Sequence, residues 1–110
     1  MKKEISVIVP FYNEEKYIEQ SILRLIDTNL FKKIILVNDK SSDNSGQIAE
    51  KICEHFDFIE LINLDSQKGK GNAIRVGLKY VKTSHLIIHD ADLEYFPSDI
   101  PEMFEAAKTN

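Results

Sequence analysis

Two aspartates one residue apart, Asp90 and Asp92, are the side chains in this sequence best suited to chemistry. They follow the short apolar run Leu86–Ile88, which predicts a strand buried on both faces. Ligands of an open parallel sheet bind beyond the carboxyl ends of its strands, so the pair would stand at such a site. Two carboxylates suit Mg²⁺ or Mn²⁺, especially where phosphate oxygens complete the coordination. The alternative is that Asp90-Ala91-Asp92 is only a polar turn after a strand.

Apolar runs and stripes indicate the elements that must position these aspartates. Strands are predicted at 5–9, 34–37, 58–64 and 86–88, the third of them nearer the edge of the sheet. Amphipathic stripes predict helices between the strands, and a last helix that carries Ile100, Met103, Phe104 and Ala107. About four alternations predict an α/β fold with a doubly wound, mostly parallel, Rossmann-like sheet in one domain, 1–110.

Local signals refine this expectation. Pro10 has no N–H to donate to a central ladder, so it should end the first strand. In the third helix, Leu78 should face inward and Gly77 should allow close packing on the sheet. Asn44, with Gln47 three residues later, resembles a capping box at the start of the second helix.

The composition is that of an ordinary globular domain, with 43% hydrophobic and 29% charged residues among 110. A formal net charge of -4 provides no basic field for nucleic acid. No apolar run reaches the roughly 18 residues of a membrane span, and no signal-peptide cleavage site is evident. These features predict a soluble, cytoplasmic protein. The single cysteine, Cys53, cannot form an internal disulfide and is expected to be a small core residue.

Polar residues follow each predicted strand. They are Tyr12-Asn13-Glu14, Asn38-Asp39, Asp65 with Gly69-Lys70-Gly71, and Asp90 with Asp92. The carboxyl ends of parallel strands meet at one edge of a sheet, so these groups should converge there. This convergence raises the odds that Asp90-Ala91-Asp92 belongs to a binding site.

Each of these groups has a second interpretation. The loop around Lys70 could present backbone N–H groups and an ammonium to phosphate, although it lacks the P-loop spacing, or it could be a solvated turn. Asp39 could accept hydrogen bonds from a nucleobase or ribose, or cap the turn that follows it. Tyr12 could stack on a base or pack against the first helix. His89 could orient Asp90 or simply end a strand.

Four blocks in the sequence resemble a known family, in the order in which that family has them. They are Val7-Ile8-Val9-Pro10-Phe11-Tyr12-Asn13-Glu14-Glu15, Ile35-Leu36-Val37-Asn38-Asp39-Lys40-Ser41-Ser42-Asp43, Gly69-Lys70-Gly71-Asn72-Ala73 and Asp90-Ala91-Asp92-Leu93-Glu94-Tyr95. They look like the nucleotide-sugar-binding part of a family 2 inverting glycosyltransferase with the GT-A fold. The resemblance is strongest to dolichol- or polyprenyl-phosphate sugar synthases and covers almost the whole chain.

The resemblance implies how a nucleoside-diphosphate sugar would bind at its nucleoside end. Pro10, Tyr12 and Glu14 would line the nucleobase pocket, and Asp39 would contact the base. Asp90 would also lie close to the ribose. One departure affects this end, because Lys40 stands where the family usually has a glycine, which could alter the turn.

The resemblance also implies the diphosphate end. Lys70 would lie near the pyrophosphate, and the D-x-D motif Asp90-Ala91-Asp92 would bind the diphosphate through Mg²⁺ or Mn²⁺ at Asp90 and Asp92. The metal would act as a Lewis acid that neutralises charge on the departing nucleoside diphosphate.

No residue of this chain matches the family's catalytic base, which we expect beyond residue 110. We therefore expect 1–110 to be the donor-binding part of a truncated transferase, with little or no transfer activity alone. The acceptor could be a polyprenyl phosphate or a saccharide, and a full-length form could associate with membranes. An exposed sheet edge would favour homo-oligomers.

Two other classes of protein stay in view. An acidic chain of 110 residues arranged in βα units also suits a response-regulator receiver domain. The first strand, however, ends in Pro10-Phe11-Tyr12 rather than in paired acidic residues, and no fifth strand with its lysine is evident. The other class is a degenerate α/β module that binds nothing and serves in assembly.

Overall fold

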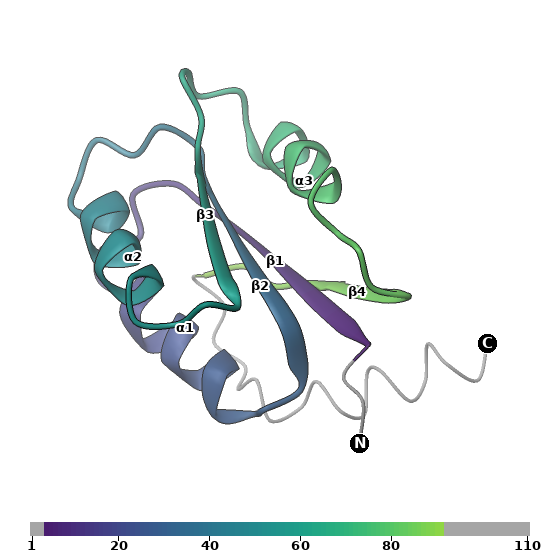
Figure 1. Ribbon diagram of the computed structural model, residues 1–110. Coiled ribbons are helices and arrows are strands. Elements are labelled where there is room, and N and C mark those ends of the chain that lie inside the picture. The colour runs from purple at the N-terminus through teal and green to yellow at the C-terminus, as the bar shows by residue number, and fades with distance from the viewer. Residues whose placement is uncertain (1–3, 92–110) are drawn as a thin grey trace.

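The computed structural model describes residues 4–91, in which strands and helices alternate strictly (Figure 1). The elements are β1 Ile5–Phe11, α1 Ile18–Asp27, β2 Phe31–Asn38, α2 Ser45–Cys53, β3 Ile59–Asn63, α3 Lys70–Leu78 and β4 His85–Ile88. The helix predicted around Ile100 lies outside the described residues. Within 4–91, no helix is long and apolar enough to cross a membrane.

The four strands of this part of the chain form one parallel sheet in the order β3-β2-β1-β4. The chain moves outward from β1 through β2 to β3, and then returns to the opposite side of β1 as β4. The direction of winding therefore reverses between β1 and β4. Such a switch point is where open α/β sheets bind ligands. The predicted doubly wound parallel sheet is confirmed.

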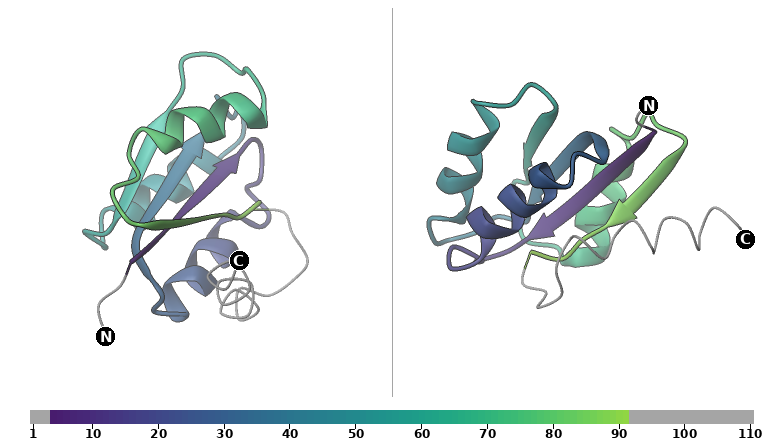
Figure 2. Two further views of the ribbon diagram at one scale, coloured as in Figure 1. Left: turned by 90° about the vertical axis from the view of Figure 1, so that its right-hand side faces the viewer. Right: turned by 90° about the horizontal axis from the view of Figure 1, so that it is seen from below.

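Helices cover both faces of this sheet (Figure 2). The side chains of Val7, Val9 and Phe11 lie in the core beneath α1 and α2, whereas Ile8 lies in a smaller cluster beneath α3. This alternation follows from the period of two in a strand. Gly77 allows α3 to approach closely, because a Cβ there would lie 2.9 Å from Ile8 Cγ2. The predicted close packing at Gly77 is confirmed.

The prediction that Pro10 ends the first strand is wrong, because β1 continues to Phe11 and pairs with β2 along its whole length. The main-chain hydrogen bonds explain why. Ile8 C=O accepts from His89 N–H on the β4 side, and Phe11 C=O accepts from Asp39 N–H on the β2 side. The main-chain N–H and C=O groups of even-numbered residues in β1 thus point toward β4, and β4 pairs with β1 only as far as Ile8. Pro10 lacks an N–H at a position where no ladder bond is formed.

The prediction that 86–88 is buried on both faces is also wrong. In β4, Ile87 packs against the core, but Leu86 is 38% and Ile88 40% exposed. These two side chains point to the face that carries α3, and α3 packs over β1 and β2. Leu78, predicted to face inward, is exposed because the sheet-facing positions of α3 are Ala73 and Gly77.

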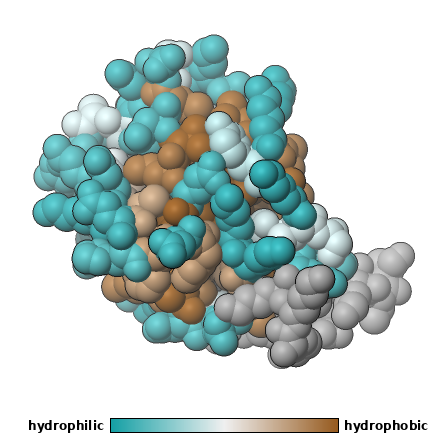
Figure 3. Space-filling model, in the orientation of Figure 1, coloured by the Kyte–Doolittle hydropathy of each residue, from teal (hydrophilic) through white to brown (hydrophobic). Residues whose placement is uncertain are grey.

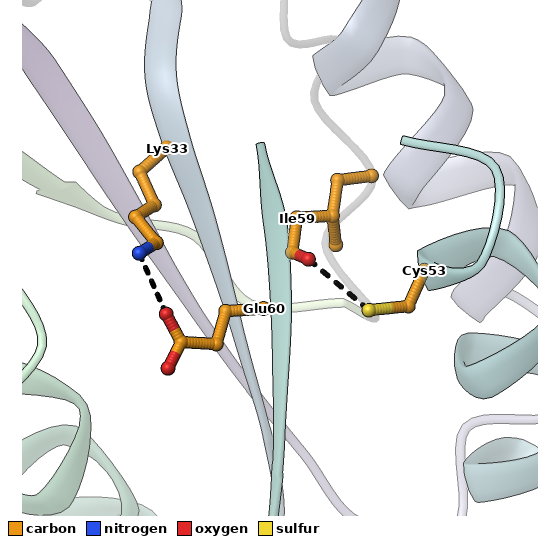
Figure 4. Close-up of polar contacts among 4 residues, drawn as sticks. All are labelled: Lys33, Cys53, Ile59 and Glu60. Atoms are coloured by element: carbon orange, nitrogen blue, oxygen red, sulfur yellow. Dashed lines mark hydrogen bonds and ion pairs between the residues drawn. The ribbon is translucent and has the colours of Figure 1, made fainter. Parts of the chain in front are cut away.

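The predicted edge position of β3 is confirmed, and most of its residues are only half-buried. Apolar surface shows between hydrophilic side chains in the space-filling view (Figure 3). Besides its parallel pairing with β2, β3 has two contacts with its neighbours that involve side chains (Figure 4). Lys33 Nζ lies 2.7 Å from Glu60 Oε1, and the Cys53 thiol donates to Ile59 C=O over 3.1 Å. Cys53 is half-buried at the margin of the core, and this burial raises the pKa of its thiol.

The start of α2 differs from the predicted capping box. Asn44 makes no side-chain hydrogen bond to the helix. The carboxylate of Asp43 instead accepts from Ser45 N–H over 2.9 Å and from the Ser45 hydroxyl over 2.5 Å. Burial raises the pKa of Asp43, but hydrogen bonds from the Ser45 hydroxyl and from backbone N–H groups, including those of Ser45 and Glu15, together outweigh it and hold the pKa below its ordinary value of 3.8.

Candidate functional site

A pocket of about 220 Å³ opens at the carboxyl ends of β1 and β4, and we call it the strand-end pocket. Its lining residues come from β1, from the loops after β1, β2 and β4, and from α3. They are Pro10, Phe11, Tyr12, Glu14, Asp39, Lys70, Ala73, Asp90 and Ala91. Seven of the eight residues proposed from sequence lie here together, and the eighth, Asp92, lies outside the described residues.

Two lining residues were missed. The predicted first strand ends before Phe11, yet Phe11 is the last residue of β1. Ala73 stands three positions after Lys70 on α3, so both lie on one face of that helix. The 3.6-residue period of the helix could have predicted Ala73 as a neighbour of Lys70.

The wall that carries Tyr12 and Glu14 is fixed by contacts with the loop after β2. Asn13 adopts a positive φ of 52°, and its side-chain oxygen accepts from Ser42 N–H over 2.8 Å. The backbone N–H of Glu14 donates to Ser45 Oγ over 2.7 Å. The loop after β1 is therefore joined by hydrogen bonds to the loop after β2 and to the first residue of α2.

The turn after β2 keeps a conformation that suits glycine, although a lysine stands there. Lys40 has a φ of 63°, in the left-handed region that favours glycine. The turn that contains it is capped by Asn38, whose side-chain oxygen accepts from Ser41 N–H over 2.9 Å. The substitution at Lys40 thus retains the positive φ that a glycine would adopt easily.

Asp39 has a structural task that neither sequence interpretation included. Its side chain caps the loop before α3 rather than the turn that follows it. Oδ1 accepts from Lys68 N–H over 3.0 Å, and Oδ2 accepts from Gly69 N–H over 2.9 Å. Asp39 is 3% exposed, and Gly69 has a φ of 96° that only glycine adopts easily. Asp39 therefore fixes the residue directly before Lys70.

Lys70 and Asp90 form an ion pair across the strand-end pocket. Lys70 is the first residue of α3, Asp90 lies two residues beyond the end of β4, and Nζ is 2.5 Å from Oδ2. The lysine side chain is 56% exposed and the aspartate side chain 25%. Among the lining residues, three carboxylates (Glu14, Asp39 and Asp90) accompany this one ammonium.

The backbone on each side of Asp90 is anchored. His89 N–H donates to Ile8 C=O over 2.9 Å, and Ala91 C=O accepts from the Ser21 hydroxyl over 2.7 Å. The His89 side chain does not line the pocket, and its burial lowers its pKa while the charge of Asp90 opposes this change. Ser21, a buried polar residue in an otherwise apolar helix stripe, was not singled out from sequence.

The oxygen ligands within the described residues could hold a divalent cation only together with further ligands. Within 4–91, no three His, Cys, Asp or Glu side chains are grouped to hold a metal ion. Asp90 offers one partly exposed carboxylate on an anchored backbone, and a hard oxygen ligand of this kind suits Mg²⁺ or Mn²⁺. Phosphate oxygens of a ligand in the pocket would then supply further ligands.

Two curated relatives match most of this chain. Poly-beta-1,6-N-acetyl-D-glucosamine synthase of Staphylococcus aureus is 36% identical over 89 residues, which cover 80% of this chain and 21% of the synthase. Dolichyl-phosphate beta-glucosyltransferase of Homo sapiens is 34% identical over 103 residues, which cover 82% of this chain and 31% of that enzyme. The chain thus spans about a fifth to a third of the length of these relatives.

Solved structures agree with the fold. TarS 1-349 of S. aureus in complex with UDP-GlcNAc superposes with a TM-score of 0.79 at 29% identity, covering 94% of this chain and 30% of that one. The mannosyltransferase PcManGT of Pyrobaculum calidifontis, in complex with GDP-Man and Mn²⁺, has the same TM-score at 22% identity, covering 90% and 30%. These neighbours are GT-A glycosyltransferases. Residues 6–110 match the family "Glycosyl transferase family 2", and the chain belongs to this family.

Proposed function

We propose that this chain binds a nucleoside-diphosphate sugar in the strand-end pocket, as the donor-binding part of a metal-dependent, inverting glycosyltransferase. The observation that carries the proposal is the convergence of Pro10, Tyr12, Glu14, Asp39, Lys70, Asp90 and Ala91 on one pocket at the switch point of the sheet. Relatives of this chain are named as transferases of sugars, and two structural neighbours were solved with UDP-GlcNAc and with GDP-Man.

The nucleoside would lie against the loop after β1. Tyr12 is 37% exposed and lines the pocket, and its ring would stack on the base. Asp39 uses one hydrogen bond on each carboxylate oxygen for the loop before α3, and each oxygen retains a second lone pair for a base N–H. Pro10 and Glu14 would complete this wall of the pocket.

The diphosphate would lie between Lys70 and Asp90. Asp90 and Asp92 would hold Mg²⁺ or Mn²⁺, and Ala91 between them would keep the backbone close to the ligand. The bound cation would supply Lewis-acid stabilisation of the nucleoside diphosphate as it departs. Lys70, at the start of α3, would place its ammonium beside the phosphates.

The acceptor half of the reaction extends the proposal. We expect a polyprenyl phosphate or a saccharide as acceptor, because the relatives include a dolichyl-phosphate glucosyltransferase and a polysaccharide synthase. Residues 1–110 alone should bind the donor with little or no transfer, since no base is assigned among them. The proposal also includes a cytoplasmic location and membrane association of a longer form. Self-association would use an edge of the sheet.

Binding measurements on the 110-residue chain test this proposal. Titration calorimetry with UDP-, GDP- and dTDP-sugars, with and without Mn²⁺, should show metal-dependent binding of one nucleotide class. Thermal unfolding should then show about 2.7 kcal/mol of stabilisation at a hundredfold excess over Kd. Asp90→Ala and Asp92→Ala should each weaken binding by about tenfold or more, equivalent to about 1.4 kcal/mol.

A matched control is Asp57→Ala, an exposed carboxylate between α2 and β3 at the far edge of the sheet. It should leave nucleotide binding unchanged. If no nucleotide binds the wild-type chain, the proposal is wrong. Binding that neither Asp90→Ala nor Asp92→Ala weakens would contradict the assigned metal ligands.

A further inference from the structure

We infer that Lys70 is an exchangeable counter-ion for Asp90. Its ammonium pairs with this carboxylate in the ligand-free protein and gives way to a divalent cation when a diphosphate binds. This inference rests on the proposed function. Its consequence is that Lys70 weakens metal binding to the nucleotide-free protein and strengthens nucleotide binding to the metal-loaded protein. Lys70 would thereby make the two ligands bind as a pair.

The geometry of the ion pair makes it suited to exchange. The Lys70 ammonium lies 2.5 Å from Asp90 Oδ2, within the space where a cation bound to that oxygen would lie. A cation and an ammonium cannot both occupy this position, because like charges so close repel strongly. Lysine is a flexible point charge with three donors, and this side chain is more than half exposed, so its ammonium can move to another partner.

The two backbones that carry the pair cannot move as easily as the lysine side chain. Lys70 starts α3, and Gly69 before it donates its N–H to the buried carboxylate of Asp39. Asp90 is anchored by the hydrogen bonds of its neighbours His89 and Ala91. The rearrangement would therefore be confined to rotation of the Lys70 side chain, which keeps its ammonium within the strand-end pocket.

The charges that line the pocket supply the reason for the exchange. Three carboxylates and one ammonium leave the described lining with two negative charges, a field that repels a diphosphate. A divalent cation would cancel this excess. Once the cation neutralises Asp90, the ammonium is released from its partner and the nearest anion becomes the diphosphate. Each ligand thus creates the favourable charge that the other needs.

A purely structural role for Lys70 predicts a different pattern. If the ion pair only tied α3 to the end of β4, its removal would loosen the pocket and weaken the binding of both ligands. An exchangeable counter-ion instead produces effects of opposite sign on the two ligands. The sign of the change in metal affinity therefore separates the two roles.

The test measures Mn²⁺ binding to the 110-residue chain by the electron paramagnetic resonance signal of free Mn²⁺, without nucleotide. Lys70→Met should bind Mn²⁺ about threefold to fivefold more tightly than wild type, the size expected from releasing one partly exposed ion pair. In calorimetry at saturating Mn²⁺, the same variant should bind UDP or GDP more weakly, by about threefold or more. Lys70→Gln should repeat both shifts if Met perturbs the helix start.

Two controls sharpen the result. Lys68→Met removes an exposed ammonium two residues before Lys70 and leaves the Lys70–Asp90 ion pair in place. It should change Mn²⁺ affinity less than Lys70→Met does. In an Asp90→Asn background, Lys70→Met should give no gain in Mn²⁺ affinity, because the carboxylate it released is absent.

Unchanged, weaker or undetectable nucleotide-free Mn²⁺ binding by both Lys70 variants would overturn the inference. If wild type still binds nucleotide with Mn²⁺, the proposed function survives that outcome. Failure of wild type to bind any nucleotide would remove the proposed function and this inference together.

Discussion

Replacement of Asp39 by asparagine tests whether its carboxylate maintains the loop before α3. In wild type, each carboxylate oxygen accepts one backbone N–H, from Lys68 and from Gly69. An asparagine side chain keeps one acceptor and turns an NH₂ group, itself a donor, toward the other N–H. Because the position is 3% exposed, water cannot easily satisfy the stranded group.

The expected cost follows from these contacts. An unsatisfied buried polar group costs about 1–3 kcal/mol, so Asp39→Asn should lower the free energy of unfolding by about 2 kcal/mol. For a domain of this size that loss corresponds to a fall of about 10 °C in Tm. Urea unfolding without nucleotide measures it. The control is Asp65→Asn, an exposed carboxylate in the same loop, which should change stability by less than about 0.5 kcal/mol.

Hydrogen exchange adds a local readout. The Lys68 and Gly69 amides should be protected in wild type and exchange faster in Asp39→Asn, since these are the N–H groups that lose or share a partner. Equal stability of Asp39→Asn and Asp65→Asn, with unchanged protection of both amides, would refute the structural role. A confirmed role would mean that weaker nucleotide binding by Asp39 variants reports loop disorder as well as a lost base contact.

Two further predictions concern packing and the loop network. Gly77→Ala should destabilise the protein by about 1–3 kcal/mol in urea unfolding, because its Cβ would overlap side chains of the sheet. The control is Gly71→Ala, whose Cβ would meet nothing within 4 Å and which should leave stability unchanged or raise it. A greater loss of stability in Gly71→Ala than in Gly77→Ala would contradict the packing described. Ser45→Ala should cost about 1–3 kcal/mol at pH 7 by stranding the Glu14 N–H. Ser45→Ala also removes the hydrogen bond from the Ser45 hydroxyl to the Asp43 carboxylate. Because the pKa of Asp43 is lowered, the stability from this hydrogen bond is full above pH 3.8 and is lost on acidification, so the cost of Ser45→Ala should shrink toward pH 3. A larger cost in acid than at pH 7 would contradict this reasoning.

The parallel sheet and the convergence of polar residues at one of its edges could be predicted because they depend on patterns along the chain. Apolar runs separated by amphipathic stripes predict a parallel sheet, and polar residues after its strands converge at one edge. Tyr12, Asp39 and Lys70 are 27 and 31 residues apart in sequence, counting from one to the next, yet they line one pocket.

The parts that were not predicted depend on which strand has which neighbour. Exposure of Leu86 and Ile88 results from the position of α3 over β1 and β2, which no local pattern encodes. The hydrogen bond from Ser21 to Ala91 joins residues 70 positions apart. The capping of Lys68 and Gly69 by Asp39 likewise requires the carboxyl end of β2 to lie beside the start of α3.

Pro10 also limits how the sheet can grow. The main-chain nitrogen of Pro10 lies on the β4 side of β1, beyond the point where β4 stops pairing, and Pro10 lines the strand-end pocket. With an N–H there, β1 would offer a free donor to any extended segment that approached, and a pairing segment would fill the pocket. The pyrrolidine ring removes that donor. At Pro10, β1 therefore offers no main-chain donor for the addition of a further strand beside the pocket.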